Sequence, residues 1–365
     1  MISRMRKYSR PVLHHAVLRT TLFERLEGAA NVPVTAVLAP PGYGKTTLVS
    51  SYIEQLEAVS LWYCVDEGDT DLGSFFHYFT EAVCAATPRR RKLPPIFQPT
   101  DAMNLKSFAR RYFSIVFQRL GSPFVIVLDD IHESQTPQWG EMLRVAVEEL
   151  PPSCRIIVMS RQPLPSELAR SNVNQEVCFI RKDDLRFNQE ELLALASAHD
   201  VNGLSNERSE AIQNMMAGWV AGLTLLFSHM RSSDSGSLIP LETKEELYDY
   251  FHSEVLRSVA EDVRNVLLTT CFLIDISVEN AIELSGDANA GEILKALFNE
   301  NYFIYRVDDE SIAYRYHPLF KSFLLSQCHR DLSKASLEHI CGLSVTLMGF
   351  MILVFFPSLI RITEI

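Results

Sequence analysis

The chain has 365 residues, of which 47% are hydrophobic and 22% are charged, and its formal net charge is −11 at pH 7. This length predicts two or three domains, and the composition is that of a soluble globular protein. So acidic a chain is not expected to hold nucleic acid over a broad surface, because binding to phosphates needs clustered lysine and arginine.

Seven cysteines are scattered along the chain without a C-x-x-C pair. This odd and unclustered set argues against a disulfide framework or a zinc site and suits a reducing cytosol. The basic N-terminus, "MISRMRKYSR", has no apolar segment after it and so is not a signal peptide. We therefore expect a cytoplasmic protein.

The first half of the chain alternates between two patterns. Residues 1–30 are expected to form an N-terminal arm that ends in a helix, "RTTLFERLEGA". Between 31 and 185, short apolar runs typical of buried strands alternate with segments of helical periodicity. The expected strands are "VPVTAVLAP", "SLWYCVDEGD", "PFVIVLDD" and "CRIIVMSR". This alternation predicts an α/β nucleotide-binding domain, a parallel sheet with helices on both faces.

The second half is mainly α. Residues 186–250 are predicted to form a helical domain. Residues 251–330 contain helices, a hairpin in "YFIYRVDDESIAYRY" and a further helix, "PLFKSFLLSQ". This order is typical of a winged helix. The helix before the hairpin, "GEILKALFNEN", carries more acid than a DNA-recognition helix should. We therefore expect no direct DNA binding from this chain.

A phosphate-binding motif follows the first expected strand. Residues 39–46, "APPGYGKT", match the Walker A pattern G-x-x-x-x-G-K-[ST], except that alanine replaces the first glycine. Glycines let backbone N–H groups converge on an anion, and the following helix adds its dipole. We expect Lys45 to reach the β- and γ-phosphates, Thr46 to ligate Mg²⁺, and Thr47 to contact the α-phosphate. The predicted nucleotide-contacting residues here are Pro41, Gly42, Tyr43, Gly44, Lys45, Thr46 and Thr47.

Two aspartates end the strand "PFVIVLDD". Doubly wound sheets build their sites at the carboxyl ends of strands, so we assign Asp129 to Mg²⁺, directly or through water. Asp130 stands where many P-loop ATPases carry a catalytic glutamate. Aspartate is shorter, which suits slow hydrolysis. Two alternatives stay open: Asp130 caps a turn, or Glu133 serves as the catalytic carboxylate.

Another strand, "RIIVMSR", ends in Ser160 and Arg161. A cation at that point stabilises the charge that develops in phosphoryl transfer, so Arg161 is a candidate catalytic residue. The alternative is a surface arginine at a strand end. No N-K-x-D guanine motif is present, which favours ATP or ADP, with Mg²⁺, over GTP.

With these segments in view, the chain resembles the signal-transduction ATPases of the MalT-like, large LuxR-family type. The resemblance covers about residues 8–340. It is carried by "RPVLHHAVLRTTLFERL", "APPGYGKTTL", "LWYCVDEGDTDLGSFFHYF", "VIVLDDIH", "GWVAGLTLL", "LYDYFHSEVL" and "YRYHPLFKSFLL". It implies an arm that lies against the adenine and domains that close over ADP at rest. It also implies that ATP and inducer open the molecule and let it multimerise. His317 in "YHPLF" matches a histidine that contacts the β-phosphate; the alternative is a packing histidine.

Residues 341–360, "CGLSVTLMGFMILVFFPSLI", form an uncharged apolar run. The family continues beyond this point into a helical sensor and a LuxR-type DNA-binding domain, and this sequence carries neither. Three interpretations stay open: a truncated or shifted reading frame, a membrane anchor and a packed helix.

The sequence thus predicts an ATP/ADP-dependent signalling switch that is a slow ATPase and associates with itself or with intact relatives. One alternative is an AAA+-like working ATPase with fast, substrate-stimulated hydrolysis. Another is a membrane-tethered, nucleotide-dependent interaction protein. A small-molecule kinase would need an acceptor base that the sequence does not reveal.

Overall fold

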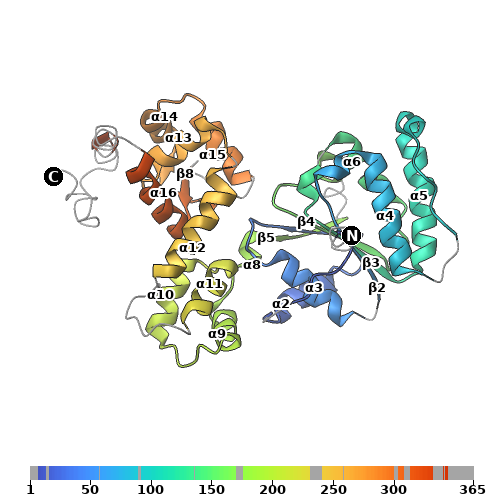
Figure 1. Ribbon diagram of the computed structural model, residues 1–365, viewed down its shortest axis with the longest axis horizontal. Helices are drawn as coiled ribbons and strands as arrows, with labels where there is room; N and C mark the ends of the chain where they lie inside the picture. Colours follow the sequence, from blue (N-terminus) through green and yellow to red (C-terminus); the bar gives the residue numbers. More distant parts are fainter. Residues whose placement is uncertain are drawn as a thin grey trace. The chain divides into compact units, whose positions relative to one another are not determined.

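The chain divides into two compact units, Met1–Ala198 and His199–Ile365 (Figure 1). The computed structural model describes residues 7–13, 16–56, 58–88, 92–134, 136–169, 176–230, 241–257, 259–299, 303–307, 313–331, 340 and 342–343. The predicted limits of the arm, the helical domain and the winged-helix domain remain predictions.

The first unit is built on a five-stranded parallel sheet. Its strands are β1 (Val34–Leu38), β2 (Val59–Cys64), β3 (Phe124–Asp129), β4 (Arg155–Ser160) and β5 (Val177–Arg181), in the order β2-β3-β4-β1-β5. All neighbouring pairs run parallel. The strands β1, β3 and β4 are buried at every position, as expected where helices cover both faces. The predicted parallel sheet is confirmed, and β5 is a strand that the sequence analysis missed.

The helices of the first unit are α2 (Thr20–Gly28), α3 (Lys45–Gln55), α4 (Leu72–Ala86), α5 (Leu105–Leu120), α6 (Pro137–Glu148), α7 (Ser166–Ala169), α8 (Lys182–Leu185) and α9 (Gln189–Ala198), with 3₁₀ turns η1 (Glu67–Thr70), η2 (Pro99–Asn104) and η3 (Ile131–Ser134). In Figure 1, α2 and α3 lie on one side of the sheet, and α4, α5 and α6 lie on the other.

The two faces of the sheet contact their helices in different ways. The face under α4, α5 and α6 is aromatic: the rings of Phe76 and Tyr112, for example, lie 4.7 Å apart, close to edge-on. On the opposite face, the buried Arg155 of β4 donates to the Leu26 carbonyl at 2.7 Å and to the Tyr52 hydroxyl. This guanidinium therefore ties the end of α2 and the middle of α3 to the sheet.

The second unit contains the winged helix. Its helices are α10 (Asn206–Met216), α11 (Val220–Met230), α12 (Leu241–Phe251), the π-helical η5 (His252–Leu256), α13 (Glu261–Thr270), α14 (Val278–Ser285), α15 (Ala290–Asn299) and α16 (Pro318–Asp331). Its strands β6 (Ile276–Ser277), β7 (Ile304–Arg306) and β8 (Ala313–Tyr316) form an antiparallel sheet in the order β6-β8-β7. The order α13-β6-α14-α15-β7-β8 is a winged helix, which confirms the predicted fold.

The core of the second unit is aromatic and centres on Trp219. Its ring stacks on Phe251 at a centroid distance of 5.4 Å and meets Phe303 edge-on at 5.3 Å. Helical periodicity runs through residues 207–230 of the sequence, and Trp219 lies directly after a break in this run. Ala217 and Gly218 interrupt this run with left-handed backbone, at φ 48° and φ 72°. α10 and α11 are therefore separate helices.

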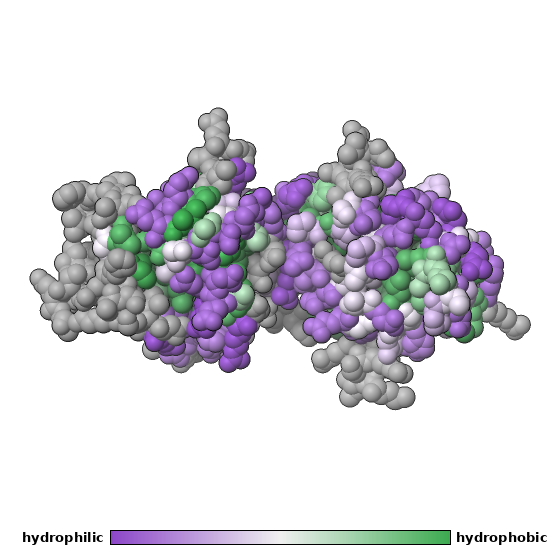
Figure 2. Space-filling model, turned by 90° about the horizontal axis from the view of Figure 1, so that it is seen from above, coloured by the Kyte–Doolittle hydropathy of each residue, from purple (hydrophilic) through white to green (hydrophobic). Residues whose placement is uncertain are grey.

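Apolar side chains reach the surface in limited areas. Figure 2 shows a largely hydrophilic described surface with smaller apolar areas. The most exposed large apolar side chains include Met103 (94%), Ile96 (82%) and Val12 (81%). Within the described part of the chain, no helix has the length and apolarity needed to cross a membrane. Almost all of 341–360, on which the membrane alternative depends, lies outside that part.

Candidate nucleotide site

The turn after β1 has the backbone that phosphate binding requires. Gly42 and Gly44 have φ angles of 75° and 78°, a left-handed conformation that side chains disfavour. Gly44 is the N-cap of α3, so the loop leads into the free N–H groups of that helix. The geometry therefore matches the predicted loop, and it explains why glycine stands at these two positions.

Lys45 is folded back over this turn. Its side chain is buried, and its Nζ donates to the carbonyl oxygens of Ala39 at 2.8 Å and Pro40 at 3.1 Å. Burial lowers the pKa of Lys45 to about 8, and the charge of Asp130 opposes that shift. The ammonium is thus desolvated, and within the described part of the chain its hydrogen bonds go to neutral carbonyls. A polyphosphate is a better partner for it than these carbonyls.

Asp129 and Thr46 meet across the sheet. The Thr46 hydroxyl donates to Oδ2 of Asp129 at 3.2 Å, although the strand β4 lies between β1 and β3. Asp129 is 4% exposed, and its Oδ1 has no hydrogen-bond partner in the described part of the chain. Burial, followed by the neighbouring Asp130, raises the pKa of Asp129 to about 7. A buried oxygen without a partner is costly, and a hard cation between Asp129 and Thr46 would satisfy it. These residues fit Mg²⁺.

A second polar group lies directly beyond β3. Asp130 has a left-handed backbone at φ 56°, and its Oδ1 lies 3.8 Å from Nδ1 of His132. The Nε2 of His132 lies 3.3 Å from Oε1 of Glu133. Burial lowers the pKa of His132, which favours its neutral form, and burial raises the pKa of Glu133. The two carboxylates predicted as candidates therefore lie on either side of an imidazole that the sequence analysis did not single out.

Arg161 belongs to the same group of side chains. It follows β4, the strand between β1 and β3. Burial has the largest effect on the pKa values of Lys45 and Glu133, and the charge of Arg161 is among the smaller effects on both. The structure thus brings the predicted Arg161 together with the Walker lysine and the acidic turn. Its catalytic role remains a prediction.

The remaining P-loop residues differ in how they face the site. Thr47 is exposed in the first turn of α3, where its hydroxyl is open to a ligand, and Pro41 is half-buried. Tyr43 is only 1% exposed, so its ring packs inside the protein and its backbone N–H is what it offers to an anion.

His317 lies in the second unit, fully buried. Its Nε2 lies 3.0 Å from the Met216 carbonyl, and the Leu319 N–H donates to its Nδ1 at 3.3 Å. This pairing places the ring proton on Nε2. Both nitrogens are therefore engaged inside the second unit, and contact with a β-phosphate remains a prediction.

The N-terminal arm lies along the P-loop helix. The Ser50 hydroxyl of α3 donates to the Pro11 carbonyl at 3.0 Å, and Arg10 pairs with Glu54 of α3 at 3.2 Å. Earlier in the arm, Lys7 pairs with the buried Asp69 at 3.0 Å. The arm is thus fastened to α3 and to η1.

The first unit also has a cavity of about 1000 Å³ that is separate from this site. Its lining includes Pro33 and Glu176, which immediately precede β1 and β5. Because the P-loop follows β1, the cavity lies at the opposite end of the strands. The nucleotide site is therefore identified by its chemistry and not by the volume of a cavity.

Comparisons with known proteins agree with this fold. Residues 252–336 match the family described as the MalT winged helix domain. The HTH-type transcriptional regulator MalT of Klebsiella pneumoniae is 28% identical over 336 residues, which cover 90% of this chain and 37% of that protein. MalT of Cronobacter sakazakii is 28% identical over 334 residues, with the same coverage. The chain thus spans little more than a third of the length of these relatives.

A solved structure extends the likeness to the first unit. A Walker-type ATPase of Pyrococcus abyssi superposes with a TM-score of 0.62 at 13% identity, over 84% of this chain and 96% of that one. At this identity the match concerns the fold alone. With a P-loop sheet, a winged helix and sequence similarity over nine-tenths of its length, the chain is similar to part of the transcriptional regulator MalT.

Proposed function

We propose that the chain is an ATP/ADP-binding switch, the nucleotide-dependent core of a MalT-like transcriptional regulator. The observation that carries the proposal is the group of Lys45, Thr46 and Asp129: a desolvated ammonium, a hydroxyl and a buried carboxylate oxygen without a partner, all beside a glycine turn. This set is complementary to a magnesium polyphosphate.

Each residue has a defined task in this proposal. Lys45 binds the β- and γ-phosphates, while Thr46 and Asp129 hold Mg²⁺, which neutralises phosphate charge when bound. Asp130 and Glu133, which lie on either side of His132, orient and deprotonate water. Arg161 stabilises developing negative charge. Asp130 directly follows the proposed Mg²⁺ ligand Asp129 and is shorter than the glutamate that many P-loop ATPases carry there, which supports slow hydrolysis.

Slow hydrolysis suits a switch, because an ATP-bound state that persists for a long time can bind partners before it decays. The proposal includes the features that the resemblance to MalT-like signal-transduction ATPases implies: nucleotide-dependent self-association and domains that close over ADP, with His317 at the β-phosphate. The working-ATPase alternative differs in one measurable property: its turnover is fast and responds to a substrate.

The test is nucleotide content and turnover of the full chain, beside Lys45→Ala. We expect bound ADP or ATP and a turnover of about 10⁻² per second or less, as for other nucleotide switches. Typical enzymes turn over about 10 times per second. Lys45→Ala should lose both binding and turnover.

The matched control is Lys106→Ala, which removes an exposed lysine of α5 and should leave both unchanged. Rapid turnover would overturn the switch in favour of a working ATPase. Absence of nucleotide binding in the wild-type chain would overturn the proposed function altogether.

A further inference from the structure

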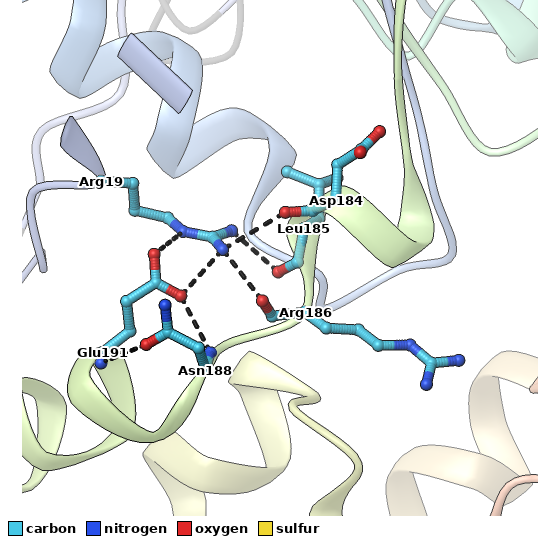
Figure 3. A network of polar contacts seen from close by, with 6 residues as sticks. All are labelled: Arg19, Asp184, Leu185, Arg186, Asn188 and Glu191. Carbon is cyan, nitrogen blue, oxygen red and sulfur yellow. Dashed lines mark hydrogen bonds and ion pairs between the residues drawn. The ribbon is translucent and has the colours of Figure 1, made fainter. Parts of the chain in front are cut away.

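A buried arginine of the arm holds the segment that leads out of the sheet. Arg19 is 7% exposed and immediately precedes α2. Its guanidinium contacts the connection between β5 and α9, which lies more than 160 residues further along the chain. Figure 3 shows this group pointing into a ring of acceptors from that connection.

The contacts use the whole fork of the guanidinium. Two nitrogens bind the Glu191 carboxylate at 2.8 and 3.0 Å. The carbonyls of Leu185, Arg186 and Asp184 accept at 2.8, 3.0 and 3.4 Å. These carbonyls stand at the end of α8, where a helix leaves them without internal partners. Arg19 therefore caps α8 and pairs with the start of α9 at once, a geometry that lysine cannot supply.

Glu191 is itself fixed by its surroundings. Its backbone N–H donates to Oδ1 of Asn188 at 2.9 Å, and its carboxylate accepts the Asn188 N–H at 3.0 Å. This reciprocal pair begins α9 as a capping box does. The ion pair with Arg19 thus joins the arm to an already ordered helix start.

The same connection runs beside the P-loop. β5 pairs with β1 so that Arg181 lies opposite Leu38, the last residue before the P-loop. The residues that follow Arg181 therefore leave the sheet next to the glycine turn. Tyr43 stands between the two glycines. Burial has the largest effect on its pKa, and the charges of Arg186 and Asp183 have the next largest. Together with the register of β5 on β1, this influence places Arg186 at the end of the sheet where the P-loop lies.

Arg186 has a restrained position. Its guanidinium pairs with Asp183 at 3.1 Å, and its side chain extends away from Arg19 in Figure 3. Arg19 binds the backbone carbonyl of Arg186 and not its guanidinium, so Arg19 fixes the backbone from which this side chain extends while the side chain keeps its pair with Asp183.

We propose that Arg19 is a positioning residue for the nucleotide site, holding the β5–α9 connection so that Arg186 contributes to binding a nucleoside di- or triphosphate. This inference rests on the proposed function. It adds a cation outside the Walker motif and a remote residue that sets the place of that cation.

The test is the dissociation constant of ADP for the full-length wild type, Arg19→Ala, Arg186→Ala and the double variant. Each single variant should bind about tenfold more weakly, in the range typical of residues that orient a ligand's partners. The double variant should bind ADP with about the affinity of the weaker-binding single variant, because both residues act through one group. Backbone amides of residues 182–191 should exchange hydrogen faster in Arg19→Ala.

Arg119→Ala is the matched control. Arg119 is also buried, and it binds Thr87 and Lys92 in the connection between α4 and α5. It lies at the end of α5 just before β3, away from the carboxyl ends of the strands. This variant should lower stability without changing the affinity for ADP.

Three outcomes separate the claims. If the wild type binds ADP and Arg19→Ala binds it equally well, the inference is wrong and the proposed function stands. If the two losses multiply in the double variant, Arg19 does not act through Arg186. If the wild type binds no nucleotide, both claims fail. Should Arg19→Ala not fold, Glu191→Gln removes the ion pair while glutamine keeps the cap, and it should weaken binding in the same direction.

Discussion

The carboxyl group of Asp129 holds a proton in the folded chain at pH values where the unfolded chain has lost it. Burial raises its pKa from 3.8 to about 7. Between these values the folded state binds more protons, so stability falls as pH rises through the window and is lowest above it. We expect Asp129→Asn to remove this slope and to stabilise the nucleotide-free first unit by about 1–3 kcal/mol at pH 8. Urea unfolding at pH 5 and pH 8 measures both effects.

Asp249→Asn is the control for Asp129→Asn, because it neutralises an exposed carboxylate of α12. Magnesium with ADP should reverse the order of stability, since the cation compensates the charge that the variant lacks. An unchanged pH slope in Asp129→Asn would contradict the assignment of this proton.

Lys45 predicts a pH dependence of ligand binding as well as of stability. Burial lowers its pKa to about 8, so the free protein loses the ammonium above that pH. Without Mg²⁺, and above pH 8 where Asp129 is already largely ionised, ADP affinity should fall by up to about tenfold per pH unit as Lys45 loses its proton. Calorimetric titration between pH 7 and pH 9.5 measures this. The chain should also gain stability as pH rises from about 8 to 10.5, where the unfolded lysine still holds its proton. A flat affinity profile would show that Lys45 keeps its charge throughout.

The residues of the site differ in how far the sequence reveals them. Lys45 and Thr46 belong to a local motif, and Asp129 ends an apolar strand, so spacing alone predicts where they lie. His132 was missed because it acts from a 3₁₀ turn that hydrophobic periodicity does not describe. Arg19 was missed because its partner Glu191 lies 172 residues away, and pairings at that distance leave no local pattern.

At the scale of elements, one edge strand and one helix break escaped prediction, while the central strands and the other edge strand, β2, did not. β5 lies at an edge of the sheet, and only two of its five positions, Val177 and Ile180, are fully buried. It therefore lacks the continuous apolar run of β1, β3 and β4, which is the feature that identifies a buried strand. The break between α10 and α11 does have a local signal, the pair Ala217-Gly218, but apolar periodicity continues on both sides and hides it.

The break supplies a test of backbone strain. Ala217 ends α10 at φ 48°, a conformation that costs an alanine about 1–2 kcal/mol and that glycine adopts freely. Because glycine also gains entropy in the unfolded chain, Ala217→Gly should stabilise the second unit by about 0.5 kcal/mol. Ala221→Gly makes the same change inside α11 and should destabilise it by about 1 kcal/mol. Denaturant unfolding followed by Trp219 fluorescence measures the stability of both variants. An equal loss of stability in the two would exclude strain at Ala217.

At the scale of the whole molecule, two units with separate aromatic cores contain the parts of one proposed switch. The nucleotide residues lie in the first unit, and His317, the predicted β-phosphate contact, lies in the core of the second. Trp139 is fully buried in the first unit and Trp219 in the second, so variants that retain one tryptophan report on each unit by itself.

This division makes the switch testable by mass action. At a hundredfold excess over its dissociation constant, ADP with Mg²⁺ should stabilise the state that binds it by about 2.7 kcal/mol. If the units close over ADP, thermal unfolding should shift upward at both Trp139 and Trp219, and Lys45→Ala should remove both shifts. A shift at Trp139 alone would contradict the switch and leave a nucleotide-binding unit beside an independent winged helix. In that case the bonds of His317 to Met216 and Leu319 describe its whole role, that of a packing histidine.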